Sequence, residues 1–224
     1  MLQVSSALFV RFLLTLIVSL ALTMAPGPAY AANTINIGDA RALPLGSTVT
    51  IKGTVTVASG TFASSTFDQG FALQDKSGGI YVSMGTDVGL QLGDQAEVTG
   101  QLEDSFGLLI LAPAGPSDVK HKGQGRPVAP AAVSTGSVNE ATEGRLVVVE
   151  GVITQAVSSD LPYGYKFYVN DGSGEIRIFV SASAGVDLSG LTLGQHVRVI
   201  GFSAQFDTTY EVQPRVQADI TVLS

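Results

Sequence analysis

The feature that most constrains the fold is an internal repeat that spans most of the chain. The segment 38–46 recurs 98 residues later as 136–144, and the segment 71–78 recurs 96 residues later as 167–174. Because the offset drifts by only a few residues, the length differences fall in loops, where insertions are tolerated. The repeat therefore predicts two domains of one fold. Further matched segments are 49–55 with 147–153, 92–94 with 193–195, and 118–119 with 219–220.

The apolar residues within each copy alternate with a period of two, as Ile176 and Ile178 do in the second copy. This period is typical of half-buried β-strands, and no segment after residue 31 shows the period of an amphipathic helix. The sequences Lys-Ser-Gly-Gly at 76–79 and Asp-Gly-Ser-Gly at 171–174 each separate two such strands, and this composition is typical of a tight hairpin. The sequence predicts an all-β protein.

Each copy is expected to hold five short strands. The first strand is long and carries a glycine near its middle, Gly53 in one copy and Gly151 in the other. A glycine inside a long strand is a common device for bending it, so that one strand serves both sides of a small barrel. We therefore expect a closed five-stranded barrel in each copy. The expected boundaries are barrel 1 over residues 33–119, a basic, glycine-rich linker over 120–127, and barrel 2 over 128–224.

Three segments of the second copy, residues 143–152, 169–177 and 213–215, resemble the tandem OB-fold (oligonucleotide/oligosaccharide-binding) modules that accompany secreted bacterial nucleases. The resemblance extends over nearly all of residues 35–224 and is stronger in the second copy. It implies two tandem five-stranded OB-like barrels. These motifs consist mostly of turn and strand residues, so they specify the fold better than the ligand.

The N-terminus has the pattern of a signal peptide over residues 1–31. Arg11 precedes the apolar run 12–24, and a Pro/Gly break then leads to the small-residue cleavage pattern at 29–31. A run of this length is short for a membrane-spanning helix, which needs about 20 residues, and an uncleaved anchor is the alternative. We therefore expect a secreted protein, extracellular or periplasmic, with no stable membrane insertion after cleavage.

Catalytic and metal-binding groups are scarce. The chain has no cysteine, only two histidines, and none of the common metalloprotease, phosphate-loop or serine-hydrolase motifs. Asp75 and Asp171 occupy equivalent positions before the two hairpins, where a carboxylate ordinarily bonds to turn amides; calcium binding or acid–base chemistry is the alternative. We therefore expect a non-catalytic protein without metal or cofactor.

In an OB barrel the ligand lies across the outer face of strands two and three, flanked by the loops that join strands one to two and four to five. In the second copy the alternation turns Phe167, Val169, Ile176, Ile178 and Val180 inward, which leaves Lys166, Tyr168, Asn170, Arg177 and Phe179 outward. Rings interleaved with cations suit single-stranded nucleic acid, because bases stack on the rings while phosphates meet the charges. The candidate nucleic-acid-binding residues are Lys166, Tyr168, Arg177, Phe179, Arg198, Tyr163, Tyr165 and Phe206 of the second copy and Tyr81 of the first.

Two other interpretations stay open. Outward rings such as Tyr168 and Phe179 are often buried against a neighbouring domain, and the cations at 120–126 suit either a solvated connector or a strip that follows phosphates.

The chain also carries 19 acidic against 12 basic residues, a net charge of −7. The leading hypothesis is a protein that binds single-stranded DNA or RNA with little sequence preference. The alternative is an envelope protein- or glycan-binding module that uses the same face.

Overall fold

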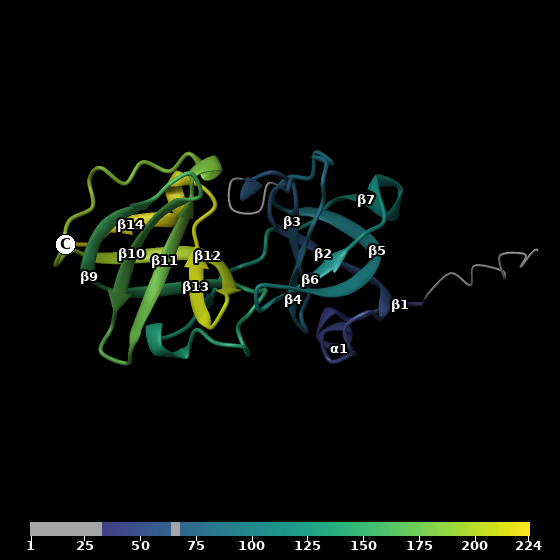
Figure 1. Ribbon diagram of the computed structural model, residues 1–224, viewed down its shortest axis with the longest axis horizontal. Coiled ribbons are helices and arrows are strands. Elements are labelled where there is room, and N and C mark those ends of the chain that lie inside the picture. Colours follow the sequence, from purple (N-terminus) through teal and green to yellow (C-terminus); the bar gives the residue numbers. More distant parts are fainter. Residues whose placement is uncertain (1–32, 64–67) are drawn as a thin grey trace, which may run out of the picture. The chain divides into compact units, whose positions relative to one another are not determined.

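The computed structural model describes residues 33–63 and 68–224, which belong to one compact unit. The expected signal peptide lies outside the described residues. The regular secondary structure of the described chain is mostly β-strand, and the strands form two seven-stranded sheets (Figure 1). It also contains a five-residue helix, α1 (Ile37–Arg41), which the sequence analysis did not predict. The described residues also include four single turns of 3-10 helix: η1 (Pro116–Asp118), η2 (Thr135–Ser137), η3 (Ala182–Ala184) and η4 (Gln217–Asp219).

The first sheet closes into a five-stranded barrel, barrel 1. Its strands pair in the order β1-β2-β3-β4-β6-β5-β7, and an additional pairing of β2 with β5 closes the ring. The short strands β1 and β7 lie outside the ring, at the two ends of this order. The strands are β1 (Thr34–Ile35), β2 (Thr48–Val57), β3 (Phe71–Gln74), β4 (Gly79–Val82), β5 (Asp94–Ser105), β6 (Leu108–Ala112) and β7 (Val119–Gln124).

The second sheet repeats this plan as barrel 2. Its order is β14-β12-β13-β11-β10-β9-β8, and β12 pairs with β9 to complete the ring. In both rings the third and fifth strands run parallel, as β4 with β6 and β11 with β13. Five-stranded rings with this pairing are OB-like. The strands are β8 (Ala131–Ala132), β9 (Leu146–Asp160), β10 (Gly164–Asn170), β11 (Glu175–Ser181), β12 (His196–Phe206), β13 (Thr209–Gln213) and β14 (Ile220–Val222).

The long first strand serves both sides of each barrel, as predicted. Residues 48–54 of β2 pair with β5, whereas residues 54–57 pair with β3. The change of partner falls beside Gly53, where an added Cβ would lie 3.0 Å from the carbonyl oxygen of Gln74. A Cβ added at Gly151 would lie 2.7 Å from the backbone carbonyl group of Asn170. Glycine is therefore needed here because two strands approach closely.

The predicted inward residues form the two barrel cores. In barrel 2 the side chains of Phe167, Val169 and Ile178 are fully buried in one cluster that also contains Ile176 and Val180. Barrel 1 has an equivalent cluster around Phe71, Leu73 and Ile80. The alternation predicted from the sequence is confirmed in both copies.

The repeated aspartates stabilise turns. Asp171 accepts hydrogen bonds from the backbone and side chain of Ser173 and from the backbone N–H and hydroxyl of Thr135. Asp75 accepts equivalent bonds from Ser77 and from the N–H of Ile37. Each carboxylate thus joins its hairpin to the segment that precedes the barrel's first strand. The structural interpretation of these two residues is confirmed.

The segment expected to be a linker is largely a strand. Residues 120–124 belong to β7, which pairs with β5. Lys120 and Lys122 lie 3.5 and 3.2 Å from Glu97, and the hydrogen bond from Lys122 is the largest of the effects that lower the pKa of Glu97. His121 lies 3.3 Å from Asp94. These basic side chains have acidic partners on barrel 1. Their pairing does not favour the alternative in which residues 120–126 follow the phosphates of a nucleic acid.

Candidate ligand-binding site

The outer faces of the two barrels meet in a third apolar cluster. Tyr81 of β4, which the sequence analysis placed on the ligand face, is only 5% exposed. Its ring centre lies 6.0 Å from that of Phe202 of β12, and Phe62 of the first barrel lies 6.3 Å from the same ring. Tyr81 is therefore packed between the two barrels. The cluster comprises Val57, Phe62, Ala72, Tyr81 and Ile110 of barrel 1 with Phe202 and Ala204 of barrel 2.

Polar contacts hold the same junction together. Glu143, whose side chain is fully buried, accepts a hydrogen bond from Arg41 at 2.9 Å and one from the N–H of Leu109 at 3.3 Å. Burial raises the pKa of Glu143 even though Arg41 favours its charged form. The backbone N–H of Leu146 donates to the side-chain oxygen of Gln74 at 2.7 Å, in a buried position. Because buried polar groups need their partners, these contacts fix the barrels as one unit.

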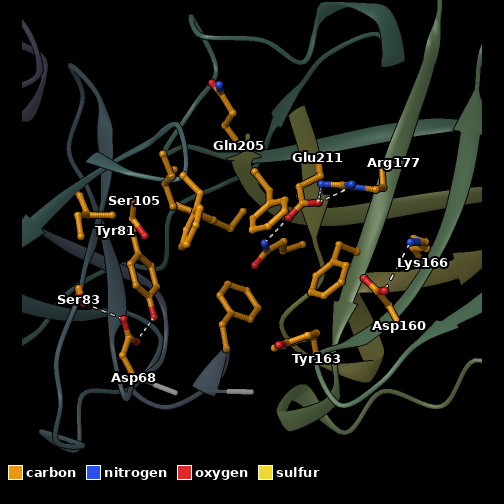
Figure 2. A pocket seen from close by; sticks show the side chains of 18 residues that line it. Asp68, Tyr81, Ser83, Ser105, Asp160, Tyr163, Lys166, Arg177, Gln205 and Glu211 are labelled. Atoms are coloured by element: carbon orange, nitrogen blue, oxygen red, sulfur yellow. Dashed lines mark hydrogen bonds and ion pairs between the residues drawn. The ribbon is translucent and has the colours of Figure 1, made fainter. Parts of the chain in front are cut away.

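A pocket of about 710 Å³ opens at this junction, on the strand-two and strand-three face of barrel 2 (Figure 2). This volume lies within the range of roughly 300–1,000 Å³ found for small-molecule sites. Its walls consist of strands from both barrels and of the turns at the ends of β5, β9 and β12. Seven aromatic rings line it: Phe62, Tyr81 and Phe106 of barrel 1, and Tyr163, Phe179, Phe202 and Phe206 of barrel 2.

The wall from barrel 1 carries a closed hydrogen-bond network. The Tyr81 hydroxyl donates to Oδ1 of Asp68 at 2.7 Å, and the Ser83 hydroxyl donates to Oδ2 at 2.8 Å, as Figure 2 shows. Burial raises the pKa of Tyr81 well above its ordinary value, and the charge of Asp68 raises it further. Tyr81 therefore stays a hydrogen-bond donor, and Asp68 is committed to this network.

The cations in the pocket also have acidic partners. Nε of Arg177 donates to Glu211 at 2.6 Å, and the Glu211 side chain is only 3% exposed (Figure 2). Burial raises the pKa of Glu211, although Arg177 opposes that shift. Lys166 lies 3.6 Å from Asp160, and both of these side chains reach solvent. Arg177 is therefore a fixed part of the wall, whereas Lys166 is held only loosely.

Two exposed rings stand at the rim. Phe106 begins the turn after β5, and Phe206 ends β12. Their ring centres lie 5.5 Å apart, although the two residues are 68% and 53% exposed. Phe106 also has a φ of 53°, in the left-handed region that a bulky residue adopts at a cost of order 1–3 kcal/mol. Asp207, in the corresponding turn between β12 and β13, has a φ of 55°, so this backbone conformation belongs to the two-residue hairpin turn.

The predicted site residues divide into two groups. Tyr81, Tyr163, Lys166, Arg177, Phe179 and Phe206 all line the pocket, and Phe179 is 8% exposed. Tyr168 lies outside this pocket and lines a second, smaller hollow on the same barrel. Tyr165 lines neither hollow, and Arg198 pairs with Glu150 at 3.2 Å on β12, between β9 and β14. The candidate residues did not include Asp68, Phe62, Phe106, Phe202 or Glu211. Phe62 and Phe106 nevertheless carry a sequence signal, because they lie in the loops of the first copy that correspond to the loops of Tyr163 and Phe206 in the second.

Within the residues that the structure describes, no group of three or more His, Cys, Asp or Glu side chains is placed to hold a metal ion. Nor does the described part of the chain contain a helix of the length and apolarity needed to cross a membrane.

No protein-family model matches the sequence, and no curated protein matches it. The solved structures that resemble it are distant. The OB domain of MM0293 from Methanosarcina mazei is 16% identical, with 43% of this chain and 87% of that chain covered and a TM-score of 0.36. A replication protein A heterotrimer bound to single-stranded DNA is 15% identical, with 43% and 83% covered and a TM-score of 0.33. Tetrameric p202 HIN2 is 14% identical, with 80% and 95% covered and a TM-score of 0.36. The OB-like fold of this chain rests on its own strand pairing.

Proposed function

We propose that the protein is a non-catalytic binding protein whose ligand is a short stretch of single-stranded nucleic acid. The observation that carries this proposal is an aromatic-lined pocket on the face that OB barrels use for their ligands, in which the rings of Phe106, Tyr163 and Phe206 are exposed. Every base offers a flat face to such rings, so binding by stacking tolerates many sequences. The size of the pocket suits a few nucleotides rather than a long strand.

The charges favour stacking over phosphate contacts. Arg177 is committed to a buried carboxylate, which leaves Lys166 as the pocket cation that can exchange its partner for a phosphate. Each phosphate contact on a single strand contributes about −0.7 to the slope of log affinity against log salt. With one such contact we expect a slope of about −0.7 rather than the steep salt dependence of a basic DNA-binding protein.

A neutral oligosaccharide is the second candidate. It is favoured by the partnered cations and by the three carboxylates of the pocket, Asp68, Asp160 and Glu211, which repel phosphate. Sugar rings also stack on aromatic side chains, and the OB face binds oligosaccharides in other proteins.

The test is a titration of the purified protein into a fluorescent, mixed-sequence single-stranded DNA of about 20 nucleotides, repeated from about 50 to 200 mM salt. The matched variants are Phe106→Ala and Phe206→Ala, which remove exposed rings from the rim. The control is Leu45→Ala, because Leu45 is 59% exposed and lines neither hollow. Arg177 is left unchanged, because its removal would leave the buried carboxylate of Glu211 without its cationic partner.

We expect saturable binding that weakens by about 1–3 kcal/mol for each ring that stacks on a base, with no change in Leu45→Ala. Binding that is indifferent to both rings would place the ligand elsewhere. Binding of a neutral oligosaccharide, without binding of the DNA, would establish the second candidate. Release of shortened products from either ligand would overturn the non-catalytic assignment.

We also infer that the chain is exported, on the basis of the apolar run and cleavage pattern within residues 1–31. The measurement is the mass and N-terminal sequence of the protein recovered from the culture medium and the cell envelope. A mature chain that begins at Ala32 is expected. A chain that keeps its first 31 residues in the membrane fraction would favour the anchor instead.

A further inference from the structure

A second hollow, of about 280 Å³, lies beside the aromatic pocket on barrel 2. Arg177 lines both, so they share one wall. In the register of β10 and β11, Tyr168 is opposite Arg177 and lines the small hollow, whereas Lys166 is opposite Phe179 and lines the aromatic pocket. Two residues along a strand span about 7 Å. One extended ligand can therefore occupy both hollows.

The small hollow differs from its neighbour in chemistry. Five hydroxyl-bearing residues line it. The hydroxyls of Thr135 and Tyr210 donate to Asp171 and Glu140. The hydroxyls of Tyr168, Thr208 and Thr209 form no hydrogen bond to another described residue. The remaining polar groups are the exposed carboxylate of Glu175 and the partnered Arg177. Glu175 accepts bonds from Thr154 and Gln155, and its two oxygens can accept more.

These groups suit a neutral partner that both donates and accepts hydrogen bonds. A phosphate would meet the negative charge of Glu175 without a free cation nearby, because Arg177 is the only Lys or Arg lining the hollow. A sugar hydroxyl, by contrast, can donate to Glu175 and accept from a threonine or tyrosine hydroxyl. A ribose offers a 2′-hydroxyl next to its 3′-oxygen, and a deoxyribose does not.

We propose that the small hollow is a ribose subsite, which gives the protein a preference for single-stranded RNA over DNA. This inference rests on the proposed function, since it assigns the sugar next to a base that stacks in the aromatic pocket. A lost 2′-hydroxyl removes one net hydrogen bond, so the expected preference for RNA is roughly three- to tenfold.

The test compares two oligonucleotides of one sequence built only from A, C and G, one RNA and one DNA, so that the bases are identical. Fluorescence anisotropy with the full chain gives both affinities. The variants Tyr168→Phe and Thr208→Val/Thr209→Val remove hydroxyls and keep the side-chain size. Thr221→Val is the matched control, because Thr221 is exposed on β14 and lines neither hollow. Circular dichroism and melting curves verify that each variant folds.

The expected result is tighter RNA binding that falls to the DNA level in the hydroxyl variants, with DNA affinity unchanged and Thr221→Val like the parent. Equal affinity for RNA and DNA would overturn the ribose subsite and leave the proposed function standing. An RNA preference that survives in the variants would also overturn it. If neither strand binds, the proposed function itself fails. Hydroxyl variants that weaken a neutral oligosaccharide instead would assign the hollow to a glycan.

Discussion

Gly79 and Gly144 bring the backbones of the two barrels into direct contact. A Cβ added to Gly79 would lie 1.9 Å from the carbonyl oxygen of Gly144, and one added to Gly144 would lie 2.1 Å from the carbonyl oxygen of Gly79. Gly144 also has a φ of 79°, which favours glycine. The junction that forms the aromatic pocket thus depends on the absence of two side chains.

We expect Gly79→Ala to destabilise the protein by about 1–3 kcal/mol or more, because the methyl group must displace backbone atoms of the other barrel. Chemical denaturation measures the change. Gly85→Ala is the matched control, because a Cβ there meets nothing within 4 Å and Gly85 has no positive φ. Equal unfolding midpoints for the two variants would mean that the barrels do not meet at this point.

The sequence predicts much of the fold because the barrel pattern is local and occurs twice. The period of two places Phe167 and Ile178 inward, and the hairpin residues fix which strands are neighbours. The junction is not predictable in this way, since it depends on contacts between the copies rather than on the pattern within one copy. Gly79 of barrel 1 matches Glu175 of barrel 2 in the repeat, so the same position makes a close contact in one copy and stays exposed in the other. A comparison of the two copies shows that they differ at this position, but it does not show which residues of the other barrel contact it.

The rings of the site could be selected from the sequence, whereas their polar partners could not. Phe206 and Tyr163 were predicted because they lie in the loops that flank the OB face. Glu211 was not, because its contact with Arg177 depends on the parallel pairing of β11 with β13. Alternation within a strand fixes which side a residue faces, but it says nothing about which non-adjacent strand lies beside it.

The pair Arg177–Glu211 gives the second prediction. Arg177→Met leaves a nearly buried carboxylate without its partner, and we expect a loss of about 3 kcal/mol. Because burial already raises the pKa of Glu211, its contribution to stability is fully present below its unfolded value of about 4.5 and is lost as pH rises through the higher folded value. The variant should therefore lose more stability at pH 8 than at pH 5.

The double variant Arg177→Met/Glu211→Met is the control for this pair. Two apolar side chains of similar size can replace a buried ion pair at little cost, so most of the loss should be recovered and its pH dependence should disappear. Denaturant unfolding of the parent, both single variants and the double variant at the two pH values measures the coupling. Additive losses would show that the two side chains do not interact in solution.

The third prediction concerns the acid side of the stability curve. Hydrogen bonds from the side chain and backbone of Ser173, followed by those from Thr135, hold the pKa of Asp171 far below its ordinary value of 3.8. A carboxyl with a lowered folded pKa contributes stability above its unfolded pKa, and that contribution is lost as pH falls below it. Asp171→Asn should therefore be less stable than the parent at neutral pH, and the gap should narrow as pH falls from about 5 towards 2.5. Asp207→Asn is the control, because Asp207 is exposed and its carboxylate forms no hydrogen bond to a described residue. If the difference in stability between Asp171→Asn and the parent stays constant across this pH range, the hydrogen bonds assigned to the Asp171 carboxylate do not stabilise the turn.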